Sequence, residues 1–71
     1  MQEQLLLQTV GEQLRRYRKV RGLSQEELAK QCGMFRTYLS RIESGTANPT
    51  VRVLHSLASV LEVEIGVLFK A

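Results

Sequence analysis

Residues 24–45 read SQEELAKQCGMFRTYLSRIESG, two short apolar-periodic stretches joined at a glycine. Ser24 and Glu27 predict a capping box, in which the hydroxyl and the carboxylate each satisfy a backbone N–H at the start of a helix. Gly33 is expected to form the turn, because a connection this short needs a left-handed backbone that glycine adopts without a Cβ penalty. Ala29 is small enough to let two helices approach where they cross. The segment predicts a helix-turn-helix.

Helical periodicity continues before this segment. A first helix is expected to begin at Thr9, with a capping box to Glu12, and to end at Gly22. Its inward side is expected to carry apolar residues at three- and four-residue spacings: Val10, Leu14 and Tyr17. The pattern leaves open whether residues 5–7 extend this helix or form a separate apolar arm.

Periodicity also continues after the helix-turn-helix. Pro49 and Thr50 open a predicted fourth helix, whose inward stripe is expected to be Val51, Leu54, Leu57, Ala58 and Leu61. A short fifth helical segment is expected over residues 65–69. No window alternates with a period of two, so the sequence predicts an all-α fold, a compact five-helix domain over residues 1–71.

Composition narrows the classes of function. The chain has ten Lys and Arg and a formal net charge of +3, which favours a polyanionic partner. Five of the basic residues lie within residues 15–21, which suggests a phosphate-binding surface, although such a run can also be only a solvated helix face. One cysteine, one histidine and no aspartate are too few for a Cys/His zinc site or a catalytic triad. We therefore expect no metal, no cofactor and no enzymatic activity.

The N-terminal residues MQEQLLLQTV lack a basic region and a long apolar run. They predict neither a signal peptide nor a membrane span, so we expect a cytoplasmic protein with no membrane partner.

The C-terminal residues are expected to form a dimer interface, because a domain of this size buries little core and a single cysteine cannot form an internal disulfide. Apolar residues crowd residues 63–69, and we expect residues 60–71 to mediate dimerisation, with an interface at Val60, Ile65, Val67 and Phe69. Gly66 would let a second backbone come close. Alternatively, Leu68 and Phe69 cover the first helix and the others are incidentally exposed; residues 5–7 are the second candidate interface.

The predicted third helix, residues 35–44, has a polar side opposite its inward Leu39 and Ile42. That side carries Arg36, Thr37, Ser40 and Arg41. Arginine can donate two hydrogen bonds to guanine O6 and N7, and the threonine methyl can contact the thymine methyl. These residues suit the edges of DNA bases, although they could also merely solvate a surface helix.

With these features together, the chain resembles the Cro and phage-repressor type of helix-turn-helix protein, also called the xenobiotic-response-element family. The stretches that carry the resemblance are VGEQLRRYRKVRGLSQEELA, CG, RTYLSRIESGTANPT and LHSLASVLEVE, within residues 10–69. The resemblance implies a lambda-repressor-like domain that binds double-stranded DNA. The small size and the RTYLSRIE stretch also resemble restriction-modification controller proteins, while phage repressors and antitoxins stay open.

The resemblance implies roles for individual residues. It assigns base reading to Arg36, Thr37 and Arg41, and the helical wheel adds Ser40 on the same side. It assigns contacts to the DNA backbone to Gln25, Ser44 and Asn48, and we expect further backbone contacts from Arg15, Ser24, Phe35 and Tyr38. It also implies an ion pair between Arg18 and Glu43, while the turn itself gives a structural role to Ala29 and Gly33.

Some side chains keep more than one interpretation. The family usually has a short polar residue where this chain has Phe35; we expect the ring to pack against Met34, while contact with the sugar-phosphate surface or a thymine methyl stays open. Tyr38 can pack at the helix edge or hydrogen-bond DNA. Cys32 is expected to be a small buried hydrophobe rather than a redox switch, and His55 a solvent-facing or subunit-contact residue.

The sequence therefore predicts a transcriptional regulator that binds a palindromic operator as a homodimer, with no small-molecule ligand. The alternative is a protein-interaction module or antitoxin-type partner that retains the fold. The operator sequence and the sign of regulation do not follow from the residues.

Overall fold

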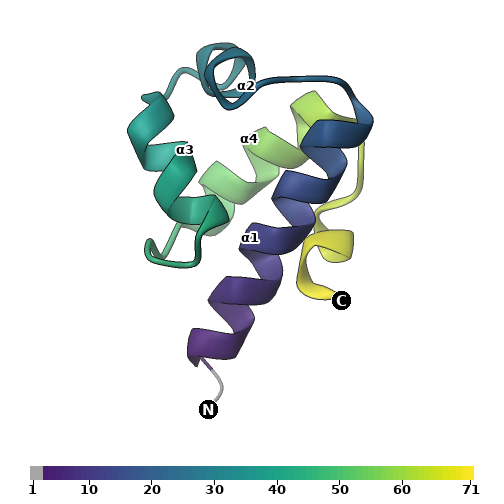
Figure 1. Ribbon diagram of the computed structural model, residues 1–71. Helices are drawn as coiled ribbons and strands as arrows, with labels where there is room; N and C mark the ends of the chain where they lie inside the picture. The colour runs from purple at the N-terminus through teal and green to yellow at the C-terminus, as the bar shows by residue number, and fades with distance from the viewer. Residues whose placement is uncertain (1–2) are drawn as a thin grey trace.

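The computed structural model describes residues 3–71, in which four α-helices and one short 3₁₀ helix follow one another (Figure 1). The elements are α1 (Glu3–Val20), α2 (Gln25–Gln31), α3 (Arg36–Glu43), α4 (Val51–Leu61) and the 3₁₀ helix η1 (Ile65–Phe69). The prediction of an all-α fold is confirmed, but the predicted fifth helix is only the 3₁₀ turn η1. Its backbone hydrogen bonds join residues three apart, as from the Val67 N–H to the Glu64 carbonyl. Residues 1 and 2 of the predicted domain lie outside the described residues.

Helix α1 is longer than the sequence analysis predicted. It begins at Glu3, so Thr9 lies within the helix and the predicted capping box between Thr9 and Glu12 is wrong. Residues 5–7 continue the helix, because Glu3, Gln4 and the three leucines themselves all have good helix propensity. The first turns of α1 extend beyond the other helices in Figure 1. Within residues 3–71, no helix combines the length and the apolar composition needed to cross a membrane.

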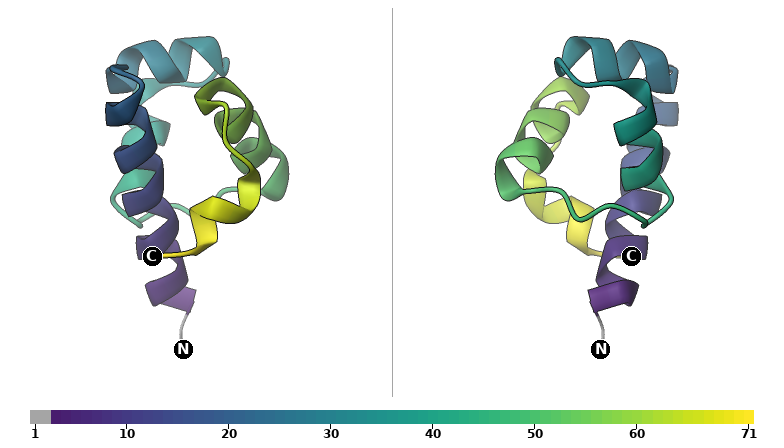
Figure 2. Two further views of the ribbon diagram at one scale, coloured as in Figure 1. Left: turned by 90° about the vertical axis from the view of Figure 1, so that its right-hand side faces the viewer. Right: turned by 90° about the vertical axis from the view of Figure 1, so that its left-hand side faces the viewer.

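Every element contributes to one hydrophobic core. In both views of Figure 2 the helices and η1 are arranged around the middle of the molecule. The core there consists of Val10, Leu14, Leu28, Ala29, Leu39, Ile42, Ala47, Leu54, Leu57, Ala58, Leu61 and Leu68. Leu68 is fully buried, so η1 completes the core. The predicted stripe of α4 is buried from Leu54 onward, but Val51 is 70% exposed, because it lies in the first turn and lines a surface groove.

Helix α1 crosses the C-terminal end of α3 at Gly11, a residue that the sequence analysis did not single out. A Cβ atom added to Gly11 would lie 2.6 Å from the Ile42 carbonyl oxygen and would also overlap the Glu43 carbonyl. Both obstacles are backbone atoms of a packed helix, which cannot move aside cheaply. The glycine therefore sets how closely the two helices approach.

We predict that Gly11→Ala lowers the free energy of unfolding by about 1–3 kcal/mol or more, because overpacking forces the backbones of α1 and α3 apart. Gly66→Ala is the matched control. A Cβ at Gly66 meets nothing within 4 Å, and the φ of Gly66 is not positive. Urea denaturation of both variants measures the difference, and equal stability of the two would contradict the close approach at Gly11.

Candidate nucleic-acid interface

Helix α2 begins with the predicted capping box. The Glu27 backbone N–H donates to Ser24 Oγ at 3.0 Å, and the Ser24 N–H donates to Glu27 Oε1 at 2.8 Å. The Ser24 backbone N–H, followed by its hydroxyl, lowers the pKa of the Glu27 carboxyl from its ordinary value. Gly33 has a φ of +69° in the turn, and Ala29 is buried where α2 meets α3. These features position α3 relative to α2.

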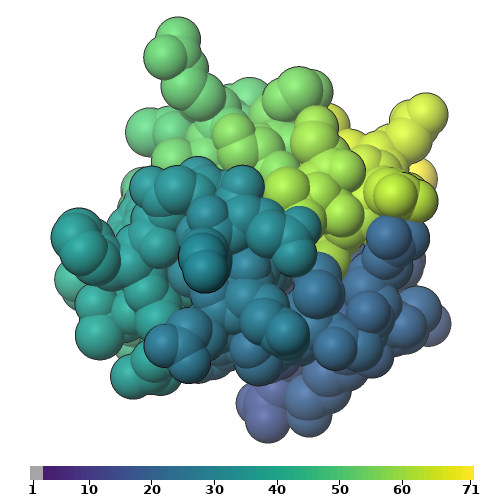
Figure 3. All heavy atoms as spheres, turned by 90° about the horizontal axis from the view of Figure 1, so that it is seen from above, coloured from purple at the N-terminus to yellow at the C-terminus, as the bar shows by residue number. Residues whose placement is uncertain are grey.

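Helix α3 turns its polar side away from the core. Leu39 and Ile42 are buried, whereas the exposed residues are Arg36, Thr37, Arg41 and Ser44; Ser40 is half-buried. Figure 3 shows that α3 and the C-terminal part of α1 reach one face of the molecule on either side of α2. The residues assigned to base reading therefore share one side of α3, next to basic residues of α1.

A buried ion pair joins α1 to α3. Arg18 Nε donates to Glu43 Oε2 at 2.7 Å, and Arg18 Nη2 donates to Glu43 Oε1 at 3.0 Å. The two side chains are 10% and 3% exposed. Arg18 Nη1 also donates to the Leu23 carbonyl at 2.8 Å, so one guanidinium holds both α3 and the loop before α2.

Gln25 connects this ion pair to the polar side of α3. Its Nε2 donates to Glu43 Oε1 at 3.0 Å, and its Oε1 accepts from Arg36 Nη1 at 3.3 Å. Gln25 was expected to contact a phosphate, whereas here both ends of its side-chain amide are engaged within the protein. A line of hydrogen bonds therefore runs from buried Arg18 to exposed Arg36.

A polar hollow lies beside this line of hydrogen bonds, between α1, α2 and α3. Its volume is about 360 Å³, and its lining residues are Arg15, Arg18, Gln25, Ser40, Glu43 and Ser44. Arg15 and Ser44 are exposed at its edge. The hollow thus brings together three of the residues assigned to the DNA backbone: Arg15, Gln25 and Ser44.

The loop after α3 is held by hydroxyl groups. Ser44 Oγ donates to the Arg41 carbonyl at 3.1 Å, and Thr46 Oγ1 donates to the same carbonyl at 3.2 Å. Thr46 was not predicted to have a role; its only signal in the sequence was its place directly after Gly45, the glycine that ends the helix. Asn48 is exposed in this loop.

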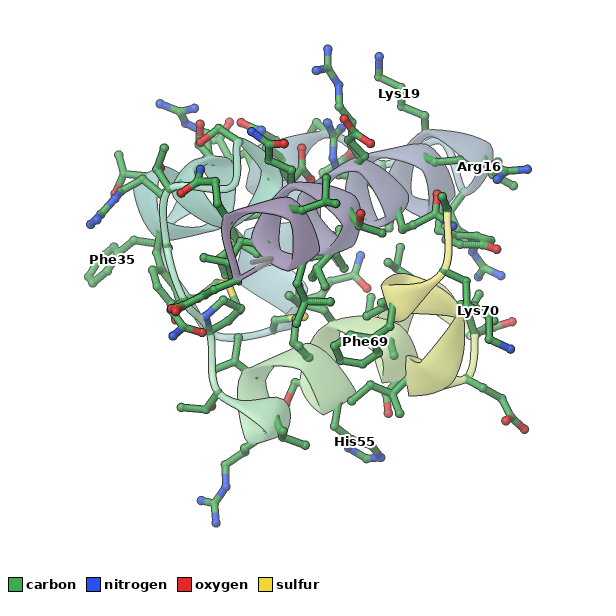
Figure 4. All side chains as sticks on the ribbon, turned by 90° about the horizontal axis from the view of Figure 1, so that it is seen from below. Arg16, Lys19, Phe35, His55, Phe69 and Lys70 are labelled. Atoms are coloured by element: carbon green, nitrogen blue, oxygen red, sulfur yellow. The ribbon has the colours of Figure 1, made fainter. Side chains whose placement is uncertain are left out.

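The expectation that Phe35 packs against Met34 is wrong. Phe35 is 84% exposed and projects from the molecule in Figure 4, while Met34 packs against the core. The apolar spacing from Phe35 to Leu39 is misleading, because Phe35 is the N-cap residue of α3 and its extended backbone directs the side chain outside the helical pattern.

The remaining side chains occupy structural positions. Tyr17 and Tyr38 are half-buried and pack against the core. Cys32 is also half-buried rather than fully buried, and its thiol donates to the Ser56 carbonyl at 3.7 Å. Burial raises the pKa of the Cys32 thiol, which disfavours the reactive thiolate. His55 is exposed on α4 (Figure 4).

We predict that Arg18→Met lowers the free energy of unfolding by about 3–5 kcal/mol, because it leaves the buried Glu43 carboxylate without its cationic partner. Arg21→Met is the matched control: it removes the exposed Arg21–Glu62 ion pair and should cost about 0–1 kcal/mol. Chemical denaturation measures both. A double-mutant cycle with Glu43→Gln that finds no coupling between Arg18 and Glu43 would contradict a stabilising role for the pair.

The comparisons with known proteins agree with this geometry. A helix-turn-helix domain family matches residues 9–68. The chain is 43% identical over 63 residues to the HTH-type transcriptional regulator SlrR of Bacillus subtilis. The matched region covers 87% of this chain and 41% of SlrR. It is 37% identical over 60 residues to SinR of the same organism, covering 83% of this chain and 54% of SinR. The chain thus spans about half the length of these curated relatives.

Solved structures show the same fold. The restriction-modification controller protein C.AhdI from Aeromonas hydrophila matches with a TM-score of 0.85 and 38% identity, covering 89% of this chain and 96% of that protein. The structure of SinR, the master regulator for biofilm formation, in complex with DNA matches with a TM-score of 0.79 and 37% identity. This match covers 83% of this chain and 95% of the SinR chain in that structure. The chain therefore belongs to the helix-turn-helix domain family.

Proposed function

We propose that this chain is a DNA-binding transcriptional regulator that acts as a homodimer on a palindromic operator. The observation that carries the proposal is the exposed polar side of α3, with Arg36, Thr37 and Arg41, beside a polar hollow lined by three helices. SlrR and SinR are HTH-type transcriptional regulators, and a structure of SinR contains DNA. The proposed activity is binding, and we propose that the chain is not an enzyme.

In this proposal α3 enters the major groove of the operator. Arg36 and Arg41 donate hydrogen bonds to guanine, while Thr37 and Ser40 contact neighbouring bases. Because the Gln25 amide accepts from Arg36, the guanidinium is already directed before DNA arrives, which reduces the entropy lost on binding. Base reading by this face supplies the sequence preference.

The polar hollow supports a contact to the sugar-phosphate backbone. A phosphate placed over it would meet the guanidinium of Arg15 and the hydroxyl of Ser44 at its edge. The charges of Arg18 and Glu43, which also line the hollow, offset each other in their ion pair. Further backbone contacts are proposed for Ser24, Tyr38 and Asn48, and for the backbone N–H of Gln25 at the start of α2. These contacts fix how deeply α3 enters the groove but carry no sequence information.

The length of the match to C.AhdI supports a narrower proposal. The chain covers 96% of that restriction-modification controller protein, but only 41% of SlrR. We propose that this protein is a regulator of the controller type, whose output depends on occupancy of the operator.

The dimer interface is proposed at an apolar groove. Val60, Ile65 and Val67 of the predicted interface are half-buried and pack against the core, while Phe69 is 40% exposed. Phe69 lines a groove of about 120 Å³ whose other lining residues are Leu6, Leu7, Val10, Asn48, Pro49, Val51 and Leu54. This groove joins the two candidate interfaces of the sequence, residues 60–71 and residues 5–7. A two-fold contact here would have to place the two α3 helices about 34 Å apart.

We predict that Arg36→Ala and Arg41→Ala each lower affinity for the operator by about 1–3 kcal/mol and relax the preference at one base pair per half-site. The operator is first selected from random DNA at a stated salt concentration, and affinities are then measured for its single-base variants. Lys70→Ala is the matched control, because it removes the same charge on the side of the molecule opposite Phe35 (Figure 4). A uniform loss with the base preference intact would contradict base reading by these arginines.

We predict that Leu6→Asp with Val51→Asp converts the dimer to a monomer, because charges cannot be buried in an apolar contact. Both residues are exposed, so the monomer should keep its fold. Val20→Asp, at the other end of α1 and 75% exposed, is the control and should stay dimeric. Sedimentation of each variant decides. If Ile65→Asp with Val67→Asp dissociates the dimer and the first pair does not, the interface lies on η1.

A further inference from the structure

Phe35 combines two unfavourable features at one position. It is the N-cap residue of α3, yet its side chain makes no capping hydrogen bond, whereas Ser24 and Thr50 cap α2 and α4 with their hydroxyls. Phe35 is 84% exposed, more than any other large hydrophobic residue that the structure describes. A short polar residue at this position would cap the helix and remove the exposed ring. Stability therefore gives no reason for a phenylalanine here.

The backbone of Phe35 is held in place on both sides. Met34, just before it, packs against the core, and the Phe35 carbonyl accepts from the Tyr38 and Leu39 N–H groups at 3.1 and 3.2 Å. The side chain therefore leaves the backbone at a defined point at the start of α3. The ring projects from the start of α3 (Figure 4), and Arg36 and Thr37 follow it in the first turn of the helix.

The chemistry of the ring selects its contact. A phenyl group can neither donate to a phosphate nor hydrogen-bond a base edge, so it gains affinity only by burying apolar surface. The main apolar group that DNA presents in the major groove is the 5-methyl group of thymine. The N-terminal residues of a recognition helix are those that reach the base edges.

We propose that Phe35 is a specificity-determining residue that recognises the 5-methyl group of a thymine beside the base pair contacted by Arg36. This inference rests on the proposed function, and it replaces the assignment of Phe35 to the DNA backbone. In the protein alone the ring is exposed to water, so it adds nothing to the stability of the fold. Its apolar surface is buried only in the complex, against the thymine methyl group, and the contact therefore contributes to DNA affinity.

The test removes the methyl group and nothing else. Each thymine of one half-site in the selected operator is replaced in turn by deoxyuridine, and affinity is measured at fixed salt. We expect the unmodified protein to lose affinity about fourfold at one thymine, which is the effect of exposing one methyl group to water. Phe35→Ala should bind the thymine operator more weakly and should not distinguish thymine from deoxyuridine at that position.

Two further variants separate recognition from folding. Phe35→Ser should raise the melting temperature by restoring a cap, and it should also lose the discrimination against deoxyuridine. Val20→Ala, which shortens another exposed apolar side chain, should keep it.

Each other outcome overturns the inference. A deoxyuridine penalty that persists in Phe35→Ala belongs to another contact, such as the Thr37 methyl group. A loss in Phe35→Ala that is equal for every sequence assigns the ring to the sugar-phosphate surface. If the intact protein selects no site at all, the proposed function fails as well, which distinguishes that failure from the failure of this inference alone.

Discussion

The carboxylate of Glu43 holds the helix-turn-helix together. It accepts hydrogen bonds from Arg18 of α1 and from Gln25 of α2, while its own backbone belongs to the end of α3. A carboxylate this deeply buried must keep its cationic and hydrogen-bonding partners, so the three helices cannot shift independently. The same residue meets α1 a second time, where Gly11 allows the backbones into contact. Charge and close packing thus fix the orientation of α3 at a single point.

The elements that the sequence predicted well depend on interactions within a few residues. The capping box of Ser24 and Glu27, and the left-handed turn at Gly33, are local, so their pattern was sufficient to locate α2 and the start of α3. The errors have other causes. Periodicity gives the side of a helix that faces inward but not where its neighbours end, and so it misjudged Val51. The start of α1 was misplaced because Thr9 and Glu12 have the spacing of a capping box although they lie within the helix.

The candidate site shows the same division between local and tertiary information. Arg36 and Arg41 could be placed on the outer side of α3, because Leu39 and Ile42 fix the inner side. The engagement of Gln25 by Glu43 and Arg36 could not be predicted, since it depends on the angle between α2 and α3. Gly11 was missed for a related reason: nothing near it in the sequence indicates that another helix crosses there.

The position of η1 has a consequence for how the protein is made. Leu68 is fully buried, and Gln13 Nε2 donates to the Val67 carbonyl at 3.4 Å. The 3₁₀ helix η1 therefore packs against α1, although the two bonded residues are 54 positions apart in the sequence. During synthesis α2 and α3 leave the ribosome well before Leu68 does. Leu68 is part of the same buried core as Val10 and Leu14 of α1. The nascent chain can therefore form its helices early, but it completes its tertiary structure only after residue 68 has emerged.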